Sequence, residues 1–218
     1  MNKMCGTNTQ DGRSMIEMLG VLAIIGVLSV GGIAGYSKAM MKFRINKTID
    51  QVSQIVANTR TLYARQRNYK SLGNGEWNTN HKVVYKANLA PKEMFEEGSG
   101  SYAMTNPFGG DVKVFSSGKN LYSDGKAFVI GFYGLPDEAC IELATQDWGE
   151  GTNSGLIAVA IQAGGTAYAA AKWDGCDGEP GNFYAACSGG SIVGIPMPID
   201  VAVEACQGNS NTVSWKFY

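Results

Sequence analysis

The first strong pattern in the chain is an apolar run that passes directly into an amphipathic one. Residues 18–37 contain no charge and are rich in Leu, Ile, Val and Gly, which is long enough for a helix to span a ~30 Å hydrocarbon core. Beyond the run, apolar or small side chains recur at spacings of four and three: Ile45, Ile49, Val52, Val56, Thr59 and Tyr63. This spacing predicts one buried stripe of a helix. Since no proline precedes Pro91, we expect a single helix of roughly 50 residues.

The apolar run by itself admits three interpretations. It could be a cleaved secretory signal, although its apolar region is too long for one. It could be an ordinary transmembrane anchor. The third interpretation rests on Glu17, because a carboxylate just inside an apolar run usually has a charged partner unless it lies among lipid headgroups. The continuity of the apolar run with the amphipathic stretch argues against a signal peptide. The GxxxG spacing of Gly31 and Gly35 permits close packing with another helix.

From about residue 71 onwards the pattern predicts an α+β head. Residues 73–110 are rich in Gly, Asn and Ser, so we expect a long irregular connection with a short helix near residues 91–97. Apolar runs, several of them alternating, predict strands at residues 112–115, 127–133, 156–161, 166–173 and 213–217. Strands joined mostly by hairpins indicate an antiparallel sheet.

Two short helices are expected in the head. The first begins at residues 135–138, where a proline precedes two acids, and its inward face holds Cys140, Leu143 and Ala144. The second follows Pro198 and covers residues 199–206.

Charge is distributed unevenly along the chain. The 218 residues carry a formal net charge of -1, which excludes a strongly basic nucleic-acid-binding protein. Residues 1–37 are neutral overall, residues 38–70 carry eight bases and one acid for a net +7, and residues 71–218 carry eight bases and sixteen acids for a net -8. The basic stem could favour anionic lipid headgroups, or it could lie against the acidic heads of neighbouring copies through Arg60, Arg65 and Arg67.

Candidate catalytic and metal-binding residues are few. His81 is the one histidine and lies in a polar stretch, so we expect a solvated loop residue. No nucleophile elbow, phosphate-binding loop, HExxH motif or zinc-like spacing occurs. The segment Asp174–Glu179 offers oxygens for calcium, but it lacks EF-hand spacing and turn formation explains it better. We therefore expect no cofactor, no metal site and no enzymatic activity.

Four of the five cysteines lie in the head: Cys140, Cys176, Cys187 and Cys206. An even number beyond a membrane-targeting segment indicates disulfides formed in an oxidising compartment. Four cysteines allow three pairings, and their spacing alone does not choose among them.

The N-terminal residues 12–19, with the sequence GRSMIEML, resemble the prepilin processing site of type IV pilins. In that family a prepilin peptidase cuts after a glycine, and the fifth residue of the mature chain is glutamate. The resemblance implies a leader of residues 1–12 that ends at Gly12, a mature and N-methylated chain that begins at Arg13, and an assembly glutamate at Glu17. The family usually has an apolar residue where this chain has Arg13. We expect Glu17 to pair with the α-amino group of a neighbouring subunit and so set the stagger between helices.

The head is similar to type IVb pilins, which include thin-pilus and toxin-coregulated-type major pilins. The similarity is carried by residues 105–110 (TNPFGG), residues 135–140 (LPDEAC) and a cysteine before an aromatic last strand. The resemblance pairs Cys140 with Cys206 and leaves Cys176 for Cys187, while Cys5 lies in the leader.

The resemblance implies a structural subunit of a pilus. After the leader, residues 13–70 form the N-terminal helix, with a transmembrane part at about 15–37 and a stem at 38–70, and residues 71–218 form the head. The prepilin would enter the inner membrane, be processed by prepilin peptidase, and be polymerised with identical subunits into an extracellular filament by an assembly platform and its ATPase. Nucleic acid is not an expected partner.

Two alternatives stay open at this point. The chain could be a minor pilin or a type II secretion pseudopilin, or it could be a membrane-anchored binding module that never polymerises. The bases that follow the apolar run (Lys38, Lys42, Arg44 and Lys47) would by the positive-inside rule place the head in the cytoplasm. Pilin topology and paired cysteines both require the opposite orientation, and we follow them because charge bias is only a tendency.

Overall fold

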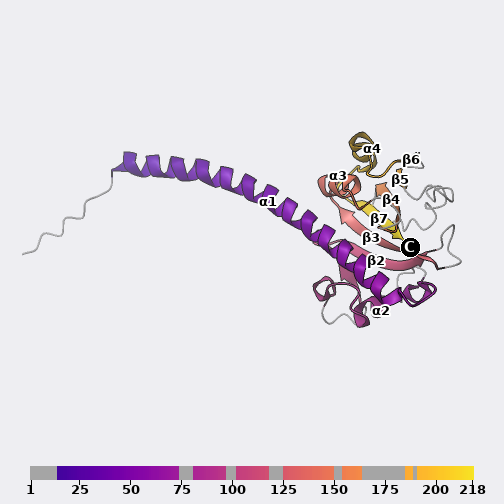
Figure 1. Ribbon diagram of the computed structural model, residues 1–218. Helices are drawn as coiled ribbons and strands as arrows, with labels where there is room; N and C mark the ends of the chain where they lie inside the picture. The colour runs from indigo at the N-terminus through magenta and orange to yellow at the C-terminus, as the bar shows by residue number, and fades with distance from the viewer. Residues whose placement is uncertain are drawn as a thin grey trace, which may run out of the picture. The chain divides into compact units, whose positions relative to one another are not determined.

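The longest element is the helix α1 (Met15–Tyr63), and the chain divides within it. The structure, a computed structural model, describes residues 14–73, 81–96, 102–117, 125–149, 154–163, 185–188 and 191–218 (Figure 1). Its two compact units are Met1–Lys42 and Phe43–Tyr218. The second half of α1 therefore belongs to the same unit as the sheet, whereas the sequence pattern began the head at residue 71.

The expected single helix is present, with 49 residues, but it ends before residue 70. Its end is set by contacts with residues distant in sequence. The Tyr63 hydroxyl hydrogen-bonds the Ser71 hydroxyl, and the Tyr69 N–H donates to the Gly125 carbonyl at 2.6 Å. These contacts turn the chain back beside the helix, and the 3₁₀ turn η1 (Lys70–Leu72) follows.

The buried side of α1 is broader than one stripe. Ile45, Val52, Thr59 and Tyr63 are buried as the spacing predicts, while Ile49 and Val56 are only half-buried. The stripe missed three buried residues in neighbouring rows: Thr48, Gln51 and Ile55. A helix that lies on a sheet buries adjacent rows of side chains, including polar ones that a hydrophobic pattern does not mark.

Among the described residues, seven strands form one sheet in the order β1-β2-β3-β7-β4-β5-β6. The strands are β1 Met104–Thr105, β2 Asp111–Ser117, β3 Ala127–Leu135, β4 Leu156–Ala163, β5 Ala185–Ser188, β6 Ser191–Val193 and β7 Asn211–Phe217. Neighbours are antiparallel except β4 and β5, which are parallel. The predicted α+β fold with an antiparallel sheet is confirmed, while the strand predicted at 166–173 lies outside the described residues.

The central strands β3 and β7 are buried on both faces. Residues paired across antiparallel strands point to the same face, so Phe128 and Phe217 lie together and their rings stack at 5.7 Å. The second half of α1 packs on this face, since the Arg60 guanidinium lies 5.7 Å from the centre of the Phe217 ring. The opposite face carries a separate apolar cluster: Phe115, Ala127, Val129, Ile157 and Ala158.

Short helices complete the second unit. They are α2 (His81–Lys86), the 3₁₀ turn η2 (Lys92–Met94), α3 (Asp137–Thr145) and α4 (Ile199–Ala205). The inward face predicted for α3 is buried, and α4 covers most of the predicted range. The short helix expected at 91–97 is the single turn η2, and α2 lies where the sequence indicated only irregular chain.

The turn that joins β1 to β2 is held by one buried amide. Asn106 donates from Nδ2 to the Tyr133 carbonyl at 2.7 Å, and its Oδ1 accepts the N–H groups of Phe108 and Gly110 at 2.9 and 3.1 Å. Gly110 lies against the same carbonyl and leaves no room for a Cβ. These contacts give the TNPFGG sequence a structural reason.

His81 is not the solvated loop residue that the sequence suggested. It begins α2 and is half-buried. Burial, and then the charge of Lys113, lower its pKa, while Asp111 and a hydrogen bond with the Tyr102 backbone oppose the shift. Burial, followed by the charge of Asp111, also raises the pKa of Tyr133 to about 12.

We expect Asn106→Ala to lower the free energy of unfolding by about 2–3 kcal/mol, because it leaves buried partners of the amide without hydrogen bonds. Denaturant unfolding of the detergent-solubilised chain measures this. The exposed Asn46 on α1 provides the control, and Asn46→Ala should change the value by less than about 0.5 kcal/mol. Equal effects of the two substitutions would contradict the role given to Asn106.

We expect folding to become less favourable as the pH falls below about 6.5, the ordinary pKa of histidine. Below that pH the unfolded chain binds a proton that folded His81 resists, whereas well above it the residue is neutral in both states. His81→Gln should therefore flatten the dependence of unfolding free energy on pH in this window. Lys82→Gln, at the exposed next residue, should leave the slope unchanged. Identical slopes for the wild-type and His81→Gln chains would refute the assignment.

Candidate assembly segment

The first half of α1 presents an apolar surface that the described chain does not cover. Every residue from 14 to 39 is exposed, and Ile16, Val27 and Val30 are 80, 76 and 72% exposed. By length and composition α1 could cross a membrane. A contiguous apolar surface of this size indicates contact with a membrane or with other protein.

Small and hydroxyl side chains suit this segment to close packing. At Gly20, Gly26, Gly31, Gly32 and Gly35 an added Cβ would meet no other heavy atom within 4 Å. The hydroxyls of Ser29 and Ser37 donate to the carbonyls four residues earlier, at 2.7 and 3.0 Å. The serines thus satisfy their donors within the helix, and the glycines allow another helix to approach closely.

Glu17 is the one charged side chain among residues 14–37, and it lies exposed in the first turn of α1. A carboxylate at this position interacts favourably with the helix dipole. Gly12 and Arg13 lie outside the described residues. The processing site and the pairing of Glu17 with a neighbouring α-amino group therefore stay predictions.

Arg60 joins the end of α1 to the last residues of the chain. Its Nη2 donates to the Tyr218 carbonyl at 3.0 Å, and its guanidinium lies over the Phe217 ring. The Tyr218 N–H in turn donates to the Gly155 carbonyl at 3.0 Å. Gly155 has a φ of +59° and lies against the guanidinium, so a larger residue there would strain the backbone and displace Arg60. These contacts of Arg60 are all made within the subunit.

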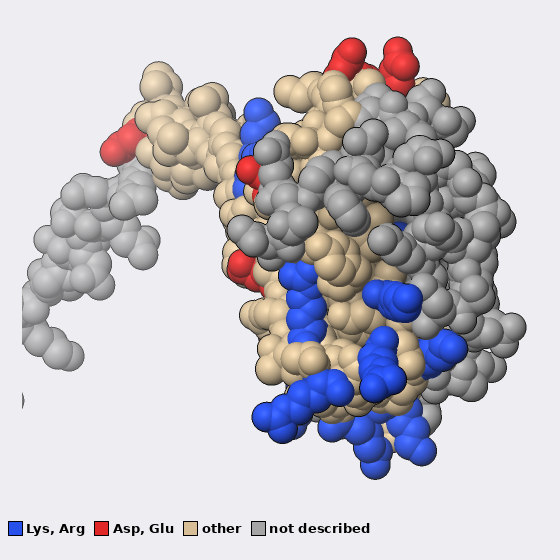
Figure 2. Space-filling view, turned by 45° about the vertical axis from the view of Figure 1, so that its right-hand side comes forward, with Lys and Arg blue, Asp and Glu red and all other residues tan. Residues whose placement is uncertain are grey.

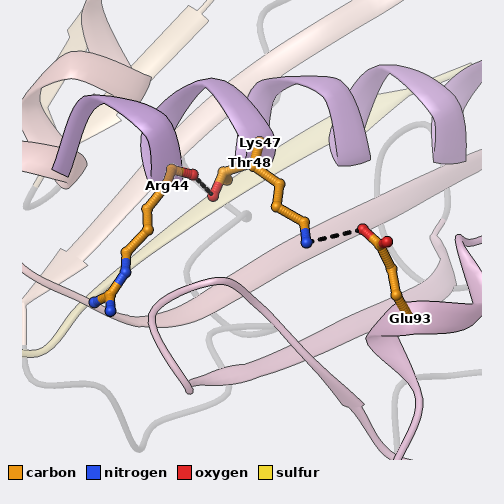
Figure 3. A network of polar contacts seen from close by, with 4 residues as sticks. All are labelled: Arg44, Lys47, Thr48 and Glu93. Atoms are coloured by element: carbon orange, nitrogen blue, oxygen red, sulfur yellow. Dashed lines mark hydrogen bonds and ion pairs between the residues drawn. The ribbon is translucent and has the colours of Figure 1, made fainter. Parts of the chain in front are cut away.

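A second set of contacts holds α1 against residues 88–93. Lys47 forms an ion pair with Glu93 at 3.1 Å, and Thr48 beside it donates to the Arg44 carbonyl at 2.9 Å (Figure 3). The Asn58 side chain donates to the carbonyls of residues 88 and 89, both at 3.2 Å. The exposed ion pair contributes at most about 1 kcal/mol, so these contacts mainly fix the position of the segment.

Basic and acidic side chains gather at different ends of the second unit. Figure 2 shows Lys and Arg on the lower side and pairs of Asp or Glu at the upper end. Exposed bases include Arg65, Arg67, Lys70, Lys82, Lys86, Lys92 and Lys126, and exposed acids of α3 and α4 include Glu138, Asp200 and Glu204. The head therefore exposes bases as well as acids, in keeping with its eight bases and sixteen acids, and exposed Glu93, Glu96 and Asp111 lie outside α3 and α4.

A disulfide joins the ends of α3 and α4. Cys140 and Cys206 bond with an S–S distance of 2.01 Å and a Cα–Cα distance of 5.9 Å, as the resemblance implied, and both residues are buried. Cys176 and the side chain of Cys187 lie outside the described residues, as does the Asp174–Glu179 segment. The second disulfide stays a prediction.

Comparison with known proteins gives a family match over most of the chain. The model of the family described as PilS N terminal matches residues 42–217, and no curated protein matches the sequence. Two similar solved structures are a type IV b pilin from Salmonella typhi and TcpA, a type IV pilin from the El Tor biotype of Vibrio cholerae. The first is 19% identical with a TM-score of 0.42 over 74% of this chain and 92% of that one. The second is 18% identical with a TM-score of 0.47 over 80% and 99%.

We expect Arg60→Ala to lower the free energy of unfolding by about 1–3 kcal/mol, because it removes a charge-assisted hydrogen bond and a cation–π contact. Denaturant unfolding measures the loss. Arg67→Ala is the matched control, since Arg67 is exposed, and it should cost less than about 0.5 kcal/mol. If the two variants were equally stable, the contacts of Arg60 with Tyr218 and Phe217 would contribute nothing to stability.

Proposed function

The chain belongs to the PilS N-terminal family, and we propose that it is a type IVb-like pilin that polymerises through its N-terminal helix as the structural subunit of a pilus. The observation that carries the proposal is the apolar half of α1, where every described residue up to 39 is exposed. In the precursor, lipid tails of the inner membrane cover this surface. In the filament, the same halves of neighbouring subunits cover it.

Glu17 has a specific task in this account. Prepilin peptidase cleaves after Gly12 and frees the α-amino group of Arg13. In the dry core of a filament an uncompensated carboxylate is costly, and the α-amino group of a neighbour supplies the opposite charge. The pair forms at one axial stagger only, so it selects the register of the helices and contributes less to overall stability.

The proposed route begins in the inner membrane and ends outside the cell. An assembly platform and its ATPase extract the processed subunit and add it to the filament. The Cys140–Cys206 disulfide supports an extracytoplasmic head, because such bonds persist in oxidising compartments. The role is structural and not enzymatic, and the partners are identical subunits.

We expect Glu17→Ala to leave the subunit folded and to reduce filament yield at least tenfold, because the carboxylate that selects the register is lost. Sheared-filament preparations measure the yield, and retention of the Cys140–Cys206 disulfide in the cell fraction reports folding. Glu96→Ala, an exposed acid outside α1, is the control and should give normal filaments. Normal yield from Glu17→Ala would overturn the role of Glu17.

The same preparations separate the alternative functions. A filament composed mainly of this chain supports the major subunit. Trace amounts in a filament of another pilin would make it a minor pilin or a secretion pseudopilin. Membrane-bound chain with no filament at all would make it an anchored binding module.

A further inference from the structure

One end of the head carries a small surface on α4 that is both apolar and acidic. Ile199 and Val203 are 69 and 51% exposed, one helical turn apart. Asp200 and Glu204 form the adjacent exposed row. We call these four residues the α4 surface. Together they form a short apolar strip beside two acids, a combination that suits a partner carrying apolar and basic groups.

The α4 surface is held firmly from behind. A helix this short is not stable alone in water. Here its other side buries Ala202 and Ala205, and the disulfide from Cys206 ties its end to Cys140 of α3. The surface is therefore ordered before any partner arrives, which lowers the entropic cost of docking.

A second surface, apolar and basic, lies at the end of α1. Leu62 in the last turn of the helix is 43% exposed, and Arg65 and Arg67 are exposed in the turn that follows the helix. We call these three residues the basic turn. The turn is held by the contacts of Tyr63 with Ser71 and Tyr69 and of Tyr69 with Gly125. Arg60 faces inward to Tyr218 and is not part of it.

The two surfaces complement each other but lie at opposite ends of the unit. Each combines exposed apolar side chains with charges, acidic on α4 and basic on the turn. Figure 1 places α4 and the end of α1 far apart within the second unit, so they do not meet within one subunit. A contact between unlike surfaces on identical chains is heterologous, and repeating it builds a closed ring or, where the rotation does not close, an open helical assembly.

We infer that the α4 surface of one subunit docks on the basic turn of the next copy of this chain. The inference rests on the proposed function and adds the head-to-head contact to the helix core. Ile199 and Val203 pack against Leu62, while Asp200 and Glu204 lie near Arg65 and Arg67. Where many copies assemble, the basic turn of a neighbouring copy is present at high local concentration beside the α4 surface.

Charge exchange in the full chain, in cells that assemble filaments, tests the contact. Glu204→Lys and Arg65→Glu should each reduce sheared-filament yield at least fivefold, because each places like charges across the interface. The double variant Glu204→Lys/Arg65→Glu should restore yield to within twofold of wild type. Glu96→Lys changes the net charge by the same amount as Glu204→Lys, at an exposed site outside both surfaces, and should have no effect.

Val203→Ser tests the apolar part without changing charge and should also lower the yield. An intact Cys140–Cys206 disulfide in each variant shows that the subunit is folded. Wild-type yield from both single charge variants, or a double variant no better than the worse single one, would overturn the inference while leaving the proposed function intact. Absence of this chain from wild-type filaments would overturn both.

Discussion

The constraint on which the rest of the molecule depends is an apolar helical surface with nothing in the described chain to cover it. Residues 14–39 are exposed throughout, and they include bulky side chains such as Ile16, Leu28 and Ile33. Water disfavours this surface by roughly 25 cal/mol for each Å² left exposed. Lipid or other helices must therefore receive it, and the glycines, the self-bonded serines and the single Glu17 all fit a segment that exchanges one apolar environment for another.

Under the proposed function, the second half of the same helix has a different role, because it stays attached to the head while the first half moves from lipid to the filament core. It is part of the core of the second unit, where Ile45, Val52 and Ile55 are fully buried. Arg60 and Asn58 add polar contacts to the chain end and to residues 88–89. Attachment is distributed along the helix, so a force applied to the helix is shared by the sheet.

Much of the fold follows from residue pattern, and the failures have physical causes. The uncharged run and the alternation in β7 are long, regular signals, and the structure contains both elements. The end of α1 at Tyr63 was missed because a hydrogen bond from Tyr69 to Gly125 sets it, and no local propensity encodes that contact. β5 was not predicted because its four residues, AACS, show no alternation of apolar and polar side chains. The strand is recognised only by its parallel pairing with β4, which is a contact distant in sequence.

The candidate site residues could likewise be predicted from sequence only in part. Glu17 and the Cys140–Cys206 pair came from motif resemblance, and the disulfide is present in the structure. The α4 surface has no sequence signature, because exposure of Ile199 and Val203 depends on which side of α4 packs inward. His81 was misjudged for a similar reason, because its burial, the main cause of its lowered pKa, depends on tertiary packing, as does its proximity to Lys113 of β2.

A density map of sheared filaments from cells that produce this chain would show what covers the apolar half of α1. We expect a helical filament built of this chain, with residues 15–39 of many copies packed against one another along the axis and the heads outside. A filament that lacks the chain, or one in which residues 15–39 face water, would contradict this expectation.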